Sequence, residues 1–313
     1  HKESKLVKNM DFLKINGGHG EGGGQIIRSA IALSCITKQP IHLENIRKNR
    51  KNEGLKAQHL TAIQILQKIS KADVIGAKIG STELKFIPGN VENLELIEDV
   101  KTAGSISLIL QVLIPVVSIS QKKLSLIIKG GTDVLWSPSM DYTQHVLKEA
   151  YSRMGIEFSV EIIKRGYYPK GNGEVKLEVY PSKIKSLTLS KRETNNLKLK
   201  CTFSKISIDV IKEKIEMIKE KISKANFNVE IEIKEEEAID TGASLLIYSI
   251  DKNSIIGIDG LFDNKKQNFD LDFEKFNNSL GVDESLADML VVPASLGINK
   301  TVFQVKEITE HLE

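Results

Sequence analysis

The 313-residue chain is longer than a single hydrophobic core usually organises, so we expect one large and one smaller domain. Its 44 basic and 41 acidic residues nearly balance, so attraction for nucleic acid must come from local clusters of charge. Two cysteines exclude a disulfide framework, and the lack of a membrane-length apolar run or a signal-peptide core predicts a cytoplasmic protein with no membrane partner.

A glycine-rich loop at residues 17–24 follows an alternating strand at 11–16 and leads into an amphipathic helix at 25–37. Six of the eight loop residues are glycine, which is more than a tight strand-to-helix turn requires. The excess indicates a backbone that lies close against a ligand. Free N–H groups at the start of the helix favour an anion as that ligand.

Gly18, Gly20 and Gly23 also match the glycine spacing of dinucleotide-binding folds. We reject that interpretation because Glu21 would repel a pyrophosphate and the next strand has no convincing ribose-binding acid at its end. A carboxylate beside an anion site is better explained as a metal ligand, or as a counter-charge for a cationic intermediate.

A basic loop at 47–54 connects the second expected strand, 41–46, to a second helix at 55–70. In a β-α-β-α unit the loops after the first two strands emerge at the same sheet edge, so we expect the basic and glycine loops to converge. Arg47 and Arg50 can clamp a phosphate there, because arginine suits bidentate recognition. Arg28, one turn into the first helix, lies on the same side.

The β-α-β-α-β-β order recurs in the next stretch, which predicts a structural repeat of about 80 to 90 residues. Richer charge from 184 to 276 indicates a separate small α/β domain. After it, a helix at 286–296 and a strand at 301–308 predict the start of a third unit, which we expect to be cut short at its C-terminus. The predicted organisation is therefore a large domain of two repeats at 10–183, an insertion at 184–276, and the start of a third repeat at 277–313.

Three histidines lie near candidate chemistry. His59 is one turn into the second helix and can orient a phosphate, and His19 lies in the glycine loop. His311 follows the last expected strand, at the corner equivalent to the basic loop. The chain shows no Ser/His/Asp order and no zinc-type histidine spacing, so hydrolase and zinc-protease interpretations have little support.

With these residues in view, the chain resembles the RNA 3′-terminal phosphate cyclase family. The matching motifs cover nearly the whole chain outside the insertion, at residues 20–28, 46–60, 80–83, 102–111, 130–132, 165–174 and 286–288. The resemblance implies an α/β (α+β) fold with a large domain of three β-α-β-α-β-β repeats, related to that of the enolpyruvyl transferases, and a small inserted domain. It also implies a ligase that uses ATP and Mg²⁺ or Mn²⁺ to convert an RNA 3′-terminal phosphate to a 2′,3′-cyclic phosphate.

In the family's chemistry a histidine attacks the α-phosphate of ATP, AMP then passes to the RNA 3′-phosphate, and the 2′-hydroxyl displaces it. His311 matches that histidine, and a neutral imidazole is a competent nucleophile. By the same resemblance Glu21 would hold the metal, and phosphoryl transfer needs positioned charge of the kind that arginines supply. The implied catalytic arginines are Arg28, Arg47 and Arg50, and the implied RNA-binding residues are Arg47, Arg50, Gln58 and His59.

The resemblance further implies a nucleotide site lined by Gln111, Pro138, Ser285, Asp288 and Met289. Ser285 and Met289 replace the tyrosine and glutamine that usually flank the Leu-Ala-Asp motif. The missing aromatic ring and amide predict looser adenine packing or a shifted nucleotide preference.

Two other classes remain open. A catalytically silent branch of the family acts in ribosome assembly, but it lacks the nucleophilic histidine, so His311 argues against it. An enolpyruvyl transferase shares the repeat, but it needs two full globular halves and forms no histidyl nucleotide. The expected partners are ATP and RNA with a 3′-terminal phosphate, and the oligomeric state is left open.

Overall fold

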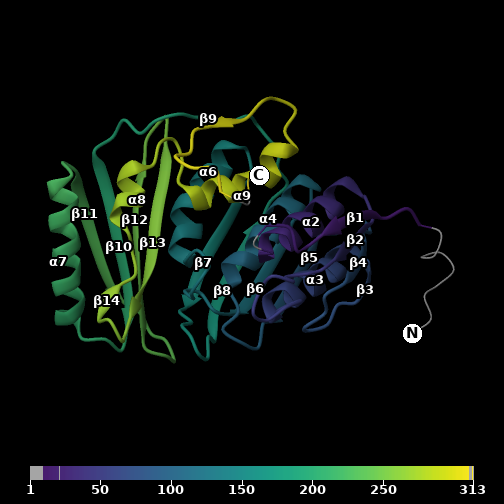
Figure 1. Ribbon diagram of the computed structural model, residues 1–313, viewed down its shortest axis with the longest axis horizontal. Coiled ribbons are helices and arrows are strands. Elements are labelled where there is room, and N and C mark those ends of the chain that lie inside the picture. Colours follow the sequence, from purple (N-terminus) through teal and green to yellow (C-terminus); the bar gives the residue numbers. More distant parts are fainter. Residues whose placement is uncertain (1–9, 21, 310–311, 313) are drawn as a thin grey trace.

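The computed structural model describes residues 10–20, 22–309 and 312 (Figure 1). Helices and several small sheets form an elongated α+β molecule, which confirms the predicted fold class. The first repeat lies at one end, the second repeat in the middle, and the inserted domain at the other end (Figure 1).

The first repeat places two helices on a four-stranded sheet. Its strand order is β1-β2-β4-β3, in which β1 and β2 are parallel and the other two pairs are antiparallel. The elements in chain order are β1 (Leu13–Asn16), α2 (Gly24–Thr37), β2 (Ile41–Glu44), α3 (Ala57–Ser70), β3 (Asp73–Ile75) and β4 (Leu84–Ile87).

The second repeat has the same topology, with strand order β5-β6-β8-β7 and one parallel pair, β5 with β6. Strand β5 was not predicted from the sequence, because three of its six residues are acids. The elements are β5 (Leu94–Asp99), α4 (Ile106–Ile119), β6 (Leu124–Gly130), α5 (Met140–Tyr142), the π-helical η1 (Thr143–Leu147), α6 (Lys148–Arg153), β7 (Phe158–Lys164) and β8 (Gly173–Val179).

A third unit begins before the insertion. Strand β9 (Thr188–Leu189) pairs in parallel with β15 (Val302–Phe303), and α9 (Glu284–Ser295) lies between them in the chain. This β-α-β order is that of β1, α2 and β2. Leu187 and Leu189 are buried in the large core, so the large domain continues past 183 and the insertion begins near Asn196. The predicted boundary at 184 was too early because a two-residue strand leaves no alternating pattern to detect.

The inserted domain has its own hydrophobic core, formed between α7 and one face of a five-stranded sheet of order β11-β10-β12-β13-β14. The opposite face of the sheet turns toward the large domain (Figure 1). Its elements are β10 (Asn196–Ser204), α7 (Ile208–Lys224), β11 (Asn228–Glu235), β12 (Gly242–Ile250), β13 (Ile255–Asp263), β14 (Asn268–Phe269) and α8 (Phe273–Asn278).

A buried ion network joins the two domains at Arg165, which is 1% exposed. Its guanidinium contacts Asp133 at 3.1 Å and Asp141 at 2.9 Å in the second repeat, and Glu236 of the insertion at 2.7 Å. Burial lowers the pKa of Arg165, but the three carboxylates raise it above its usual value. Thr202 of the insertion completes the network with a hydrogen bond to Asp141 at 3.2 Å.

The equivalent helices of the three units, α2, α4 and α9, pack against one another inside the large domain. This arrangement brings the starts of helices from three distant chain segments into one region. None of the helices in the described part of the chain is both long and apolar enough to span a bilayer.

Candidate active site

The glycine loop and the basic loop meet at the edge of the first sheet, where the topology had predicted their convergence. The side-chain amide of Asn49 donates hydrogen bonds to the carbonyls of Gly18 at 2.9 Å and Gly20 at 3.1 Å. Gly22 has a φ of +62°, and a Cβ there would lie 3.4 Å from the Asn49 nitrogen. Glycine is therefore needed at this position for its backbone conformation.

The start of α2 differs from the starts of α4 and α9. Ser105 caps α4 by accepting a hydrogen bond from the Leu108 N–H at 3.3 Å, and Asp283 caps α9 from the Leu286 N–H at 2.9 Å. The N-cap of α2 is Gly23, which has no side chain to offer. Since no described side chain caps α2, it is the one of these three helices whose first N–H groups stay available to an anion.

His59 points a ring N–H at that helix start. It is 2% exposed, and its Nδ1 accepts a hydrogen bond from the Lys56 N–H at 3.1 Å, which places the ring proton on Nε2. Nε2 has no hydrogen-bond partner among the described residues. A Cβ on Gly24 would lie 2.6 Å from this Nε2 and 2.8 Å from an Arg28 Nη1, so both donors converge beside the helix start.

The pKa of His59 is lowered to about 3, first by burial and then by the positive charges of Arg28, Arg47 and Lys56. The imidazole is therefore neutral at physiological pH, and it serves the site as a hydrogen-bond donor rather than as a cation. Lys56 belongs to the basic residues that follow the second strand in the sequence. Its pKa is lowered by slight burial and by Arg47, which marks it as a further member of the cationic cluster.

Arg28 and Arg47 are partly buried and incompletely paired. Arg28 donates to the Gln25 side-chain oxygen at 2.7 Å, but its Nε and that of Arg47 have no partner among the described residues. Burial and then Arg47 lower the pKa of Arg28 to about 10, while Asp288 acts to raise it. Burial and then Arg50, which is exposed, lower the pKa of Arg47. Desolvated cations without counter-ions are costly, and a bound anion would relieve that cost.

Gln58, which is predicted to bind RNA, connects two repeats. Its side-chain oxygen accepts a hydrogen bond from the Ser105 N–H at 3.1 Å, at the start of α4. It also lines a small cavity with Arg28 and His59. The amide of Gln58 therefore ties the cationic cluster to the second repeat.

The third unit reaches the same region through α9. Asp288 accepts a hydrogen bond from the Thr309 hydroxyl at 2.5 Å, and its charge acts on Arg28. Leu312 packs against the large hydrophobic core. The predicted nucleophile His311 and the predicted metal ligand Glu21 both lie outside the described residues.

The residues expected to line the nucleotide are only partly brought together. Pro138 and Ser285 line one cavity of about 340 Å³. Met289 is 7% exposed and packs in the core, and its carbonyl accepts a hydrogen bond from the Tyr151 hydroxyl at 3.3 Å. Gln111 is partly buried on α4 and does not line that cavity.

Trp136 lines the same cavity as Pro138 and Ser285, and sequence reasoning missed it. Its side chain is 94% exposed, and its backbone lies in the left-handed region with a φ of +62°. An exposed tryptophan in a conformation that side chains rarely adopt is a functional signal. In the sequence, the sole tryptophan of the chain beside a Ser-Pro turn was the available clue.

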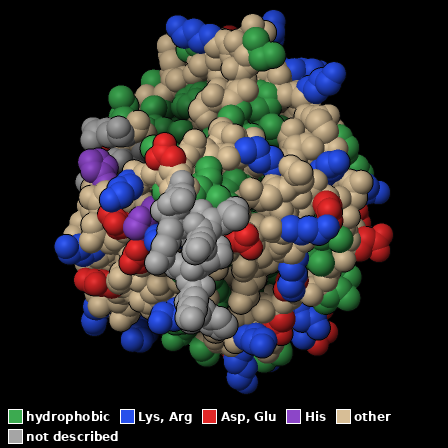
Figure 2. Space-filling view, turned by 90° about the vertical axis from the view of Figure 1, so that its right-hand side faces the viewer, with side chains coloured by type: hydrophobic (Ala, Val, Ile, Leu, Met, Phe, Trp, Pro, Cys, Tyr) green, Lys and Arg blue, Asp and Glu red, His purple; other side chains and the backbone are tan. Residues whose placement is uncertain are grey.

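Among the described residues, one group of three has metal-ligand atoms within 4.8 Å of one another: His42, Glu44 and Glu83. The two ring nitrogens of His42 face different glutamates, Glu83 at 2.5 Å and Glu44 at 3.7 Å. His42 and Glu44 lie on β2, and Glu83 directly precedes β4. Basic and acidic side chains are interspersed on this end of the molecule (Figure 2). The metal prediction at Glu21 is separate from this group.

Repeated β-α-β-α-β-β units gather arginines, a neutral histidine and a helix start without a side-chain cap into one region of an α+β protein. Comparison with known proteins shows the family of the chain. A family model described as RNA 3′-terminal phosphate cyclase matches residues 19–313. The chain therefore belongs to the RNA 3′-terminal phosphate cyclase family.

Several relatives carry the name RNA 3′-terminal phosphate cyclase. The Methanosarcina barkeri protein is 36% identical over 303 residues, covering 96% of this chain and 91% of the relative. The Methanococcoides burtonii protein is 37% identical, with the same coverage of both chains. The Saccharolobus solfataricus protein is 37% identical over 91% of this chain and 87% of its own.

Proposed function

We propose that this protein uses ATP to convert an RNA 3′-terminal phosphate into a 2′,3′-cyclic phosphate. The observation that carries the proposal is a set of donors at the start of α2 that have no hydrogen-bond partner among the described residues, namely the Nε2 of His59, the Nε of Arg28 and the Nε of Arg47. A terminal phosphate matches these donors in charge and in hydrogen-bonding capacity. Membership of the family supports the same reaction.

In the proposed complex, phosphate oxygens accept hydrogen bonds from His59, from Arg28 and from the free N–H groups of α2. Because His59 is neutral, it orients the phosphate without titrating near neutral pH. Arg47 and Arg50 add positive charge next to the transferring group, and such fixed charge stabilises a phosphoryl-transfer transition state. Mg²⁺ or Mn²⁺, with Glu21 as its proposed ligand, would neutralise further phosphate charge.

The chemistry has three proposed steps. An imidazole nitrogen of His311 bonds to the α-phosphorus of ATP, and the bond to the leaving pyrophosphate breaks. An oxygen of the RNA 3′-phosphate then takes the AMP group from the histidine. Finally the RNA 2′-oxygen, losing its proton, bonds to the 3′-phosphorus, and AMP leaves.

The nucleotide would lie near the cavity of Pro138, Ser285 and Trp136, where the exposed indole can stack on a base. Asp288 links that side to the cationic cluster through its charge on Arg28. Gln111 and Met289 stay predicted nucleotide contacts, which ligand binding would have to bring to the cavity.

Labelled ATP tests the proposal directly. The protein, incubated with ATP labelled at the α-phosphate, should acquire acid-labile, base-stable label, and added RNA 3′-phosphate should become 2′,3′-cyclic. His311→Ala should abolish the labelling, whereas His19→Ala should keep some of it. Label that persists in the His311 variant would reassign the nucleophile, and an absence of cyclic product with the unaltered protein would overturn the proposed function.

A further inference from the structure

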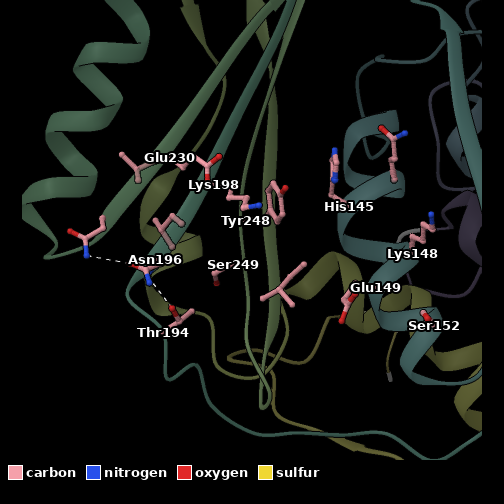
Figure 3. A pocket seen from close by; sticks show the side chains of 15 residues that line it. His145, Lys148, Glu149, Ser152, Thr194, Asn196, Lys198, Glu230, Tyr248 and Ser249 are labelled. Atoms are coloured by element: carbon pink, nitrogen blue, oxygen red, sulfur yellow. Dashed lines mark hydrogen bonds between the residues drawn. The ribbon is translucent and has the colours of Figure 1, made fainter.

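A cleft of about 900 Å³ separates the inserted domain from the large domain (Figure 3). One wall is the face of the inserted sheet that α7 does not cover, formed by β10, β11 and β12. The other wall is the helical segment η1–α6 of the second repeat. The cleft shares no lining residue with the cationic cluster at α2.

An aromatic pair connects the two walls. The rings of His145, from η1, and Tyr248, from β12, are stacked with centroids 5.3 Å apart and an interplanar angle of 16°. Burial and then the charge of Lys200 lower the pKa of His145, so this imidazole is neutral and aromatic at physiological pH. The hydroxyl of Tyr248 has no hydrogen-bond partner within the described part of the chain. The pair therefore offers a flat surface with an available polar group.

Two lysines beside the pair are uncompensated. Lys198 on the sheet and Lys148 on the helix line the cleft, and neither forms an ion pair with a residue that the structure describes. Lys200, in contrast, lies 3.5 Å from Asp141 and 3.7 Å from Glu232. Unpaired ammonium groups at a cleft suit a ligand with spaced negative charges.

The remaining lining is rich in amides and contains two acids. Asn228 donates to the Asn196 side-chain oxygen at 3.3 Å, which leaves other amide donors and acceptors directed at the cleft. Glu149 is paired with Arg153 at 2.8 Å. Glu230 is the register neighbour of Lys198 on β11, without an ion pair between them in the described structure. Amide groups match the hydrogen-bonding edges of nucleobases.

The position of the cleft relates it to the proposed active site. The five-residue π-helical segment η1, an arrangement often found at functional sites, carries His145 toward the inserted sheet. On its other side η1 packs against α9, which carries Asp288. One helix layer, about 10 Å thick, thus separates the cleft from the helix that reaches the cationic cluster.

We propose that this cleft binds single-stranded RNA upstream of the 3′-terminal nucleotide, with a base against the His145–Tyr248 pair and backbone phosphates beside Lys198 and Lys148. Stacking on an aromatic surface next to unpaired cations is how proteins bind single strands with little sequence preference. The inference rests on the proposed function, because it assigns a second binding region to the same RNA substrate.

The test compares RNA 3′-phosphates of about two and about ten nucleotides, a range that brackets the site size of a single-strand module. Fluorescence anisotropy gives the Kd of each oligonucleotide, and cyclisation gives its KM. The unaltered protein should bind the longer RNA more tightly. Lys198→Glu and Tyr248→Ala should each raise the Kd of the longer RNA about tenfold, as loss of one stacked or charge contact predicts. The shorter RNA and self-adenylation should be unaffected.

Two variants act as controls. Lys212→Glu makes the same charge change on the exposed side of α7, away from the cleft, and should leave both Kd values unchanged. Tyr248→Phe keeps the ring and should keep most of the binding. Because Tyr248 is 9% exposed, its alanine variant can lose stability, and Lys198→Glu then carries the test alone.

Equal affinity for both lengths, or a Lys198→Glu variant that binds the longer RNA normally, would overturn the proposed cleft site. A fall in affinity that is the same for both lengths would overturn it as well. Failure of the proposed function is distinct, because the unaltered protein would then cyclise neither RNA while anisotropy still reported the length dependence.

Discussion

Two shielded arginines of the large domain show opposite electrostatics. Arg165 contacts three carboxylates, which raise the pKa of its guanidinium above the usual value despite burial. Arg28 has the amide of Gln25 as its hydrogen-bond partner, and burial together with Arg47 lowers its pKa to about 10. The first charge contacts three carboxylates, whereas the one described carboxylate that raises the pKa of the second, Asp288, does not offset burial and Arg47.

The difference separates structural from functional use of the same side chain. Around Arg165 every charge has a counter-charge, and removal of one partner leaves the others buried and uncompensated. Around Arg28 the described neighbours are cations, a neutral histidine and one acid, Asp288, so positive charge is in excess and a bound anion would offset it. A substitution at Arg165 should therefore lower the stability of the fold, whereas a substitution at Arg28 should weaken ligand binding and leave stability nearly unchanged.

The largest expected effect is on stability at the domain junction. Arg165→Met should lower the free energy of unfolding by about 3–5 kcal/mol, because Asp133 and Asp141 are 1% and 2% exposed and would lose their main counter-ion. Denaturant unfolding of the variant and of the unaltered protein measures the difference. A loss of less than about 1 kcal/mol, the size typical of an exposed ion pair, would show that the network contributes little to stability.

Arg28→Met is the matched change at the open site. It should leave the free energy of unfolding nearly unchanged, because a desolvated and poorly paired charge is removed. Its Kd for an RNA 3′-phosphate should rise by about 10- to 100-fold, the size of a charge-assisted contact of roughly 1.5–3 kcal/mol. Inorganic phosphate should raise the Tm of the unaltered protein and not that of this variant. Equal destabilisation by Arg28→Met and Arg165→Met would remove the contrast between the two sites.

The site around Arg28 and the repeated fold could be anticipated from the sequence. The glycine excess at 17–24 and the basic loop at 47–54 predicted where the cations gather, because strand order alone brings those loops to one edge. The repeat itself followed from periodicity and glycine-marked loops, and the two described four-stranded sheets have the same strand order.

Other features depend on contacts that no local pattern encodes. Two of the three carboxylate partners of Arg165, Asp133 and Glu236, lie 32 and 71 residues away in the chain, so its network is visible only in the folded molecule. The proposed role of His59 depends on a backbone hydrogen bond that fixes its tautomer and on an Nε2 that has no hydrogen-bond partner among the described residues. Strand β9 has two residues, too few to show a period.

The pH dependence of stability offers a finer test of the open site. His59 has a folded-state pKa of about 3, below its usual value of about 6.5, so the unfolded chain binds more protons between those pH values. His59 therefore destabilises the fold increasingly as pH falls below about 6.5, by up to about 1.4 kcal/mol per pH unit. His59→Gln should remove this contribution, so the stability of the unaltered protein relative to the variant should decline from pH 7 to pH 5.

Two acids change the free energy of unfolding with pH in the opposite direction. The unaltered protein must therefore be compared with the His59→Gln variant at each pH. Burial raises the pKa of Asp259 and of Asp283 to about 6. The folded state then binds more protons than the unfolded chain between about pH 4 and pH 6. The stability that these two acids contribute is therefore present at low pH and is lost as pH rises through about 6. Subtracting the His59→Gln curve cancels these terms. A difference that is flat with pH would mean that His59 is not held neutral by its surroundings.

The smallest expected effect, a spectroscopic one, concerns the nucleotide end of the site. Trp136 is the sole tryptophan of the chain and is 94% exposed beside Pro138 and Ser285, so its fluorescence reports on that cavity alone. ATP should quench or blue-shift the emission, because a stacked adenine replaces water at the indole. Inorganic triphosphate, which carries the charge without the base, should leave the emission unchanged while still competing for the cations near Arg28.

Trp136→Phe should keep a stacking ring and bind ATP with similar affinity, whereas Trp136→Ala should raise the Kd for ATP by about 5- to 10-fold, as one aromatic contact of roughly 1 kcal/mol predicts. An emission spectrum that ATP and triphosphate alter equally would place the base elsewhere and leave Trp136 without a role in the recognition of adenine.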